Sequence, residues 1–139
     1  MTLDLTHVHA VATEANAAHK DMGTELLAVE RHGATVGLPW RENLADAAGG
    51  VAPGALAALL DHVCSLAALI SLDDEARFGS TMSLHLDYLG PAEPGRRVHA
   101  HAECFREASE LVFVRGSAFH PETPANPVAV ALCTVATAG

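Results

Sequence analysis

Residues 49–70, GGVAPGALAALLDHVCSLAALI, place a single carboxylate, Asp61, inside a long apolar segment. The residues around it are mostly alanine and leucine, and their spacing predicts a buried helix over about 53–72. Burying a carboxylate is costly unless a partner compensates for the lost hydration. Two explanations of Asp61 follow. It forms a hydrogen bond or ion pair with His62, Ser65 or an arginine, or it acts as a general base or nucleophile near a substrate carbonyl.

The start of the same segment, Ala52-Pro53-Gly54, is the second place where chemistry could occur. Pro53 suits the first helical position, and Ala52 has no side chain that could cap the helix. The N–H groups of Gly54, Ala55 and Leu56 are therefore expected to lack partners within the helix. Such a start, with a glycine that lets another group approach, could hold a carbonyl oxygen or a developing oxyanion. The alternative is an ordinary helix start covered by water or by the preceding loop.

The spacing of these two features has a consequence for assembly. Gly54 and Asp61 are seven residues apart, which is about 10 Å along a helix. A base or nucleophile and an oxyanion donor must both come within about 3 Å of one reacting centre. Two antiparallel helices related by a twofold axis could meet this demand, with each helix start facing the other copy's Asp61. The spacing thus predicts that a site built from this pair lies at a dimer interface.

The rest of the chain supplies the elements that would position this helix. An N-terminal helix is expected within residues 1–22, a hairpin within 24–40 and a loop over 41–52. After the long helix, the pattern predicts a four-stranded meander that fills the rest of the chain. An apolar helix must be covered on all sides, and a curved antiparallel sheet wrapped around it does so. The first strand of the meander alternates two sets of residues: Met82, Leu84, Leu86 and Tyr88 against Thr81, Ser83, His85 and Asp87.

Length, charge and cysteine content limit the class of protein. The 139 residues fit a single α+β domain, and half of them are apolar. A formal net charge of −9 argues against nucleic acids and anionic membrane surfaces as partners. The three cysteines lack metal-binding or disulfide spacing, which indicates reduced core thiols in a cytoplasmic protein. No signal peptide is expected at the N-terminus, and the helix that contains Asp61 is predicted to be a core helix rather than a membrane span.

Basic and histidine side chains give weaker signals. Four of the eight basic residues lie toward the C-terminus, and they are Arg96, Arg97, Arg106 and Arg115. They could meet the phosphates of an anionic ligand, or they could lie on an exposed strand face. His99 and His101 share a strand face, but no carboxylate or cysteine joins them at ligand spacing, so no metal site is predicted.

Three segments together resemble the PaaI-like acyl-CoA thioesterases of the hotdog fold. They are GGVAPGALAALLDHVCSLAAL, STMSLHLDYLGPAEPGRRVHAHAECFRE and PVAVALCTVAT. The resemblance runs from about residue 24 to the end of the chain, and it implies a single hotdog domain in which residues 24–139 form the core. In this family the helix opens with His-Gly-Gly, and an acidic residue follows nine positions after the histidine. Here Ala52-Pro53-Gly54 stands at that opening, and Asp61 stands at the acidic position.

The resemblance also implies roles for individual residues. Asp61 would be the catalytic base or nucleophile, Thr81 would orient water, and Ser65 would match a second polar position. Asn43 and Asp46 lie nearest to a substrate-binding amide that the family often carries before the helix. Pro53 lies where the family has its first glycine, and it has no N–H to donate, so Gly54 would be the remaining oxyanion donor.

The function that the resemblance implies is hydrolysis of an acyl-CoA thioester at the interface of a homodimer or of a dimer of dimers. Coenzyme A would enter as part of the substrate, with Arg96 and Arg97 as candidate contacts, and no other cofactor is expected. Two alternatives remain open. One is a protein that binds an acyl thioester or lipid without turnover, because Ala52 and Pro53 replace the family's His and Gly. The other, ranked lower, is a hydratase or dehydratase, for which the Pro-Gly helix start is typical.

Overall fold

The computed structural model describes residue 7, residues 21–72 and residues 74–138. The N-terminal helix expected within residues 1–22 falls on residues 1–6 and 8–20, which lie outside the described part of the chain. The described residues form one long helix, α3 (Pro53–Leu72), and one antiparallel sheet of six strands. Two short 3-10 turns, η1 (Glu42–Leu44) and η2 (Glu75–Arg77), flank the helix in sequence.

The six strands run in the spatial order β1-β2-β4-β5-β6-β3, and every neighbouring pair is antiparallel. Their bounds are β1 (Glu25–Glu30), β2 (Gly33–Leu38), β3 (Phe78–Tyr88), β4 (Val98–Glu107), β5 (Leu111–Phe119) and β6 (Ala129–Thr137). The expected hairpin is present as β1 and β2. The expected meander is wrong in one respect, because β3 pairs with β6 rather than with the strand that follows it. The connection from β3 to β4 therefore crosses the end of the sheet, and β3 becomes an edge strand.

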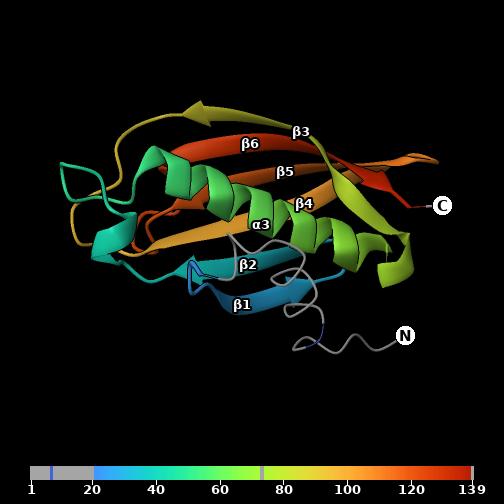
Figure 1. Ribbon diagram of the computed structural model, residues 1–139, viewed down its shortest axis with the longest axis horizontal. Helices are drawn as coiled ribbons and strands as arrows, with labels where there is room; N and C mark the ends of the chain where they lie inside the picture. The colour runs from blue at the N-terminus through green and yellow to red at the C-terminus, as the bar shows by residue number, and fades with distance from the viewer. Residues whose placement is uncertain (1–6, 8–20, 73, 139) are drawn as a thin grey trace.

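The helix lies diagonally across one face of the curved sheet (Figure 1) and packs mainly against β2, β4 and β5. From His62 to Ile70 every residue of α3 is buried, which agrees with the expectation of a helix covered on nearly all sides. The strand residues that face it are small: Ala100 and Ala102 of β4 and Ala118 of β5 are fully buried. Small side chains on the sheet let a bulky helix approach closely, so the core is alanine, valine and leucine with almost no aromatic rings.

By length and composition alone, α3 could also span a membrane, and it is the one helix in the described part of the chain that meets this test. However, 67% of the 18-residue apolar stretch of α3 that meets this test is buried inside the fold. A core helix passes the same test, so the position of α3 against the sheet accounts for its apolar character.

Candidate active site

Asp61 lies in the third turn of α3, half-buried, on the side of the helix toward β3. The hydroxyl of Thr81 on β3 donates a hydrogen bond to its Oδ1 at 2.9 Å. The family resemblance predicts Thr81 as a residue that orients water, and in the structure its hydroxyl contacts Asp61 directly. His62, one of the alternative partners, is fully buried, and its Nε2 is 3.3 Å from Thr24 Oγ1.

An irregularity in β3 gives Thr81 its direction. Ser83 pairs with Thr134 and faces away from the helix. With regular alternation, residue 82 would face the helix and pair with Val135. Instead, Thr81 is the residue that pairs with Val135. Val135 is fully buried beneath α3, and Thr81 therefore faces the helix while Met82 is 64% exposed. The expected alternation, which placed Thr81 with Ser83 on one face, is wrong at this point. A β-bulge inserts an extra residue and re-aims the side chains before it.

Three of the predicted catalytic residues share one face of α3. At about 100° per residue, Gly54 differs from Asp61 and from Ser65 by about 20° in opposite directions around the helix axis, so Asp61 and Ser65 are about 40° apart. Ser65 is 8% exposed, so its hydroxyl lies at the inner edge of this face. The face thus runs from the exposed helix start, through the half-buried carboxylate, to the buried middle of the helix.

The helix start is more open than the rest of α3. Pro53 and Gly54 are both exposed, and a side chain added at Gly54 would meet nothing within 4 Å. The expectation that Leu56 lacks a partner is wrong, because its N–H donates to the Ala52 carbonyl at 3.0 Å. Among the described residues, the N–H groups of Gly54 and Ala55 make no hydrogen bond. The hydroxyl of Tyr88, at the end of β3, donates to the Pro53 carbonyl at 2.8 Å and ties this strand end to the helix start.

A cavity of about 290 Å³ lies beside the first turns of α3. Its lining is mostly apolar and small: Met22, Asn43, Leu44, Ala45, Ala52, Ala55 and Ala58. Asn43, predicted to contact substrate, is the one polar side chain in this lining. Asp46 does not line the cavity, and its Oδ1 instead accepts the N–H of Ala48 at 3.0 Å and shapes the loop.

The two arginines predicted to contact coenzyme A are engaged with carboxylates. Arg96 pairs with Glu93 and Glu122. Arg97 pairs with Glu25 at 3.1 Å. Arg96 follows Gly95, whose N–H donates to the Gly49 carbonyl at 3.1 Å, so it lies at the same end of the molecule as the helix start (Figure 1). An anionic ligand at this end would have to compete with the paired glutamates.

Two buried thiols, Cys64 and Cys133, lie near Asp61, and their positions in the sequence do not indicate that they are neighbours. The Cys133 thiol, followed by burial, raises the pKa of Cys64 well above its usual value. Cys64 in turn lowers the pKa of Cys133. All three cysteines are free, as expected, but Cys104 is only partly buried and is not a core thiol.

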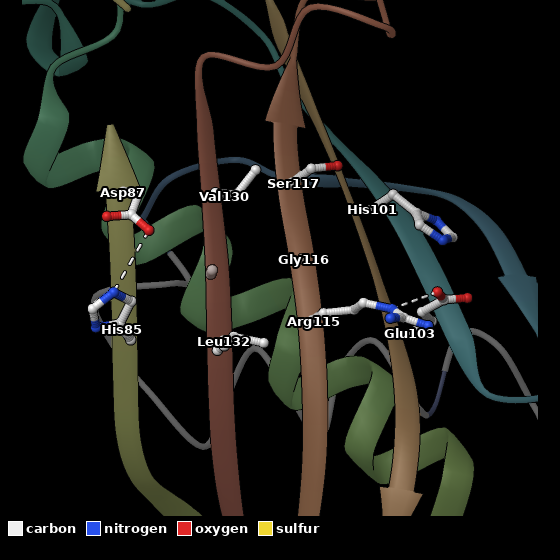
Figure 2. A pocket seen from close by; sticks show the side chains of 10 residues that line it. His85, Asp87, His101, Glu103, Arg115, Gly116, Ser117, Val130 and Leu132 are labelled. Atoms are coloured by element: carbon white, nitrogen blue, oxygen red, sulfur yellow. Dashed lines mark hydrogen bonds and ion pairs between the residues drawn. The ribbon is translucent and has the colours of Figure 1, made fainter. Parts of the chain in front are cut away.

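The opposite face of the sheet carries a separate hollow of about 430 Å³. Figure 2 shows its side chains, with α3 behind the strands: His85 beside Asp87, and Arg115 paired with Glu103 at 2.8 Å. His101, considered for metal binding, accepts or donates a hydrogen bond with Thr35 at 2.9 Å. Among the described residues, no three histidine, cysteine or acidic side chains gather as metal ligands.

Comparison with known proteins decides the family. The model of the thioesterase superfamily matches residues 48–124, more than half of the chain, and this match includes both α3 and β3. The chain belongs to the thioesterase superfamily. The predicted resemblance to hotdog-fold, PaaI-like thioesterases is confirmed.

Solved structures agree with this assignment. A protein from Pseudomonas aeruginosa is 28% identical with a TM-score of 0.82, and the alignment covers 96% of this chain and 98% of that one. A phenylacetic acid degradation-related protein from Ralstonia eutropha is 25% identical with a TM-score of 0.75, over 92% and 96% of the two chains. The Escherichia coli PaaI protein, at 16% identity and a TM-score of 0.78 over 98% and 97%, shares the fold. Comparison with curated protein sequences finds no match.

Proposed function

We propose that the protein hydrolyses acyl-CoA thioesters at a site shared by two copies of the chain. The observation that carries the proposal is the hydrogen bond from Thr81 to Asp61, at a half-buried position on the same helix face as the open N–H of Gly54. A carboxylate held by a hydroxyl can accept a proton from water, and a helix start can hold a developing oxyanion. Membership of the thioesterase superfamily supports this chemistry.

The exposed edge of the sheet supports a dimer. β3 is an edge strand of eleven residues, and Met82, Tyr88 and the adjoining Leu89 are exposed along it. A long apolar edge presents unpaired backbone groups that can pair with another chain. Pairing of two β3 strands would satisfy these groups and continue the sheet across both copies.

The same pairing would complete the site. Within one chain, Thr81 contacts Asp61 near one end of β3, and Tyr88 contacts Pro53 at the other end. An antiparallel pairing centred midway between Thr81 and Tyr88 would set each of them opposite the other in the partner copy. The helix start of one copy would then face Asp61 of the other, which removes the separation of about 10 Å within one helix.

In this site the Asp61 carboxylate would take a proton from a water molecule as the water oxygen attacks the thioester carbonyl. The Gly54 N–H of the partner copy would hold the resulting oxyanion. The intermediate would then collapse to a carboxylic acid and break the carbon–sulfur bond. The coenzyme A sulfur would leave with the proton held by Asp61. The cavity beside Ala55 and Ala58, apolar apart from Asn43, would accept the acyl group.

Thiol release from a panel of short, long and aromatic acyl-CoAs tests the proposal, with wild type and Asp61→Asn compared. Asparagine keeps an oxygen for Thr81 but cannot accept the proton from water, so the rate should fall while the fold is retained. Asp87→Asn, on the far face of the sheet, is the matched control and should keep its activity. Full activity in Asp61→Asn would refute the mechanism. Binding of acyl-CoA without turnover by the wild type would instead favour the non-catalytic alternative.

A further inference from the structure

The hydrogen bond from Tyr88 to the helix start involves the same peptide group as the proposed oxyanion donor. The Tyr88 hydroxyl donates to the Pro53 carbonyl at 2.8 Å. This carbonyl and the N–H of Gly54 belong to one planar amide. One end of the amide therefore accepts from Tyr88, while the other end, the Gly54 N–H, makes no hydrogen bond among the described residues. The proposed hydrolysis uses the N–H and assigns no role to the hydroxyl.

Strand pairing holds the Tyr88 hydroxyl at this place. Tyr88 is the last residue of β3, and it pairs with Ala129 of β6. The next residue, Leu89, donates its N–H to the Val128 carbonyl at 2.8 Å, so the chain stays attached to its neighbour beyond the strand end. Tyr88 is 48% exposed, and an exposed hydroxyl can be satisfied by water. Burial alone therefore does not require its bond to Pro53.

A hydrogen bond to the oxygen of an amide makes the N–H of the same amide a stronger donor. The amide nitrogen shares electron density with the carbonyl by resonance, and a donor at the oxygen increases this transfer. The N–H proton becomes more positive, as in any chain of hydrogen bonds that polarise one another. A carbonyl oxygen has two lone pairs, so Pro53 can accept from Tyr88 in addition to the bond that a helical carbonyl accepts.

We propose that Tyr88 is a positioning residue for the hydrolysis. Its hydroxyl fixes the plane of the amide between Pro53 and Gly54, and it polarises the N–H of this amide toward the oxyanion. Pro53 has no N–H of its own, so Gly54 fills a role that two residues could otherwise share. A stronger single donor offsets part of that loss. This inference rests on the proposed function.

The kinetic test introduces Tyr88→Phe into wild type and into Gly54→Ala. Phenylalanine keeps the ring and removes only the hydroxyl. Loss of one oxyanion donor costs about 100- to 1000-fold in rate, and one hydrogen bond strengthens its neighbour by about 10–30%. On a logarithmic scale, this share predicts a fall in kcat of about 2- to 8-fold. KM should stay unchanged, because the bond to the oxyanion forms only in the transition state.

The Gly54→Ala background and a distant hydroxyl provide the controls. In Gly54→Ala the oxyanion is displaced from the N–H, so Tyr88→Phe should cause no further loss of kcat. Thr35→Val removes a hydroxyl that contacts His101 at 2.9 Å, on the face of the sheet away from α3. This variant should keep the wild-type kcat.

Three results would overturn the inference while the proposed hydrolysis stood. A wild-type kcat in Tyr88→Phe would show that the hydroxyl does not act on the donor. A raised KM with unchanged kcat would place the hydroxyl on the substrate instead. An equal loss in the wild-type and Gly54→Ala backgrounds would indicate a structural role alone. A wild type that hydrolyses no thioester would instead refute the proposed function, and the inference with it.

Nuclear magnetic resonance tests the polarisation of the amide independently of turnover. The amide proton of Gly54 should resonate at lower frequency in Tyr88→Phe than in wild type, because the N–H is less polarised without the hydroxyl. Thr35→Val should leave this signal in place. A Gly54 signal that does not move in Tyr88→Phe would show that the hydroxyl does not polarise this amide, which would overturn the inference.

Discussion

Replacement of Gly54 by alanine should make the protein more stable and less active. In the single chain, a side chain at this position meets nothing within 4 Å, and the backbone is not in the left-handed region. Alanine restricts the unfolded chain more than glycine does, so the free energy of unfolding should rise by about 0.4–1 kcal/mol. For a domain of this size, this corresponds to an increase in Tm of about 1–4 °C. Calorimetry and circular dichroism melting curves measure both quantities.

Activity should change in the opposite direction. In the proposed dimer, the Gly54 N–H holds the thioester oxygen, and a methyl group beside it would displace the substrate. Displacement of reacting groups by about 1 Å can cost roughly 100-fold in rate, so kcat/KM should fall about 10- to 100-fold. Thiol release from acyl-CoA measures this loss.

Gly90 offers the matched control for this experiment. A side chain at Gly90 also meets nothing within 4 Å, and its backbone is likewise outside the left-handed region. Gly90→Ala should therefore give a similar gain in stability with unchanged kcat/KM. If Gly54→Ala proved both more stable and fully active, no group would approach Gly54 closely, and its role as oxyanion donor would be wrong.

The remaining predictions concern the Thr81 hydroxyl, the helix start, the strand edge and the partly buried Cys104 thiol. Thr81→Val should lower kcat about tenfold or more without unfolding the protein, because the carboxylate loses its hydrogen-bond donor; a rate equal to wild type would contradict this. Pro53→Gly should raise kcat, since it supplies a second N–H at the helix start, and the gain would be up to about 100-fold; a fall in rate would show that proline shapes the site. Met82→Asp should dissociate the proposed dimer and reduce activity together, as measured by analytical ultracentrifugation and thiol release at the same concentration. Of the three thiols, Cys104 alone should react quickly with a colorimetric reagent in the folded protein; rapid reaction of all three would contradict the burial of the other two.

Much of the central element could be predicted from the sequence. The apolar run from Pro53 to Leu72 and the proline at its start set the bounds of α3, and the structure has the same bounds. These signals are local, because they depend on helix propensity and on the spacing of apolar residues close together in the sequence. The need to cover an apolar helix on all sides then led to the curved antiparallel sheet.

The features that the sequence could not reveal depend on contacts between distant segments. The pairing of β3 with β6 depends on where the chain crosses the end of the sheet, and consecutive strands carry no mark of this choice. The bulge that turns Thr81 toward α3 interrupts a regular alternation that the sequence itself continues through Met82. Cys64 on the helix and Cys133 on the last strand are neighbours, with space provided by Gly116 on a third element. Only the tertiary structure brings these three together.

The central claim is that Gly54 of one copy and Asp61 of the other form one site, and mixing two impaired variants tests it most directly. Gly54→Ala and Asp61→Asn would be purified separately, then unfolded, mixed and refolded so that the copies exchange. In a shared site, each mixed dimer carries both substitutions at one site and neither at the other, so about a quarter of the wild-type rate should return. If each chain held its own complete site, every site in the mixture would carry one substitution. The mixture would then stay no more active than the average of the two variants, and the account would be contradicted.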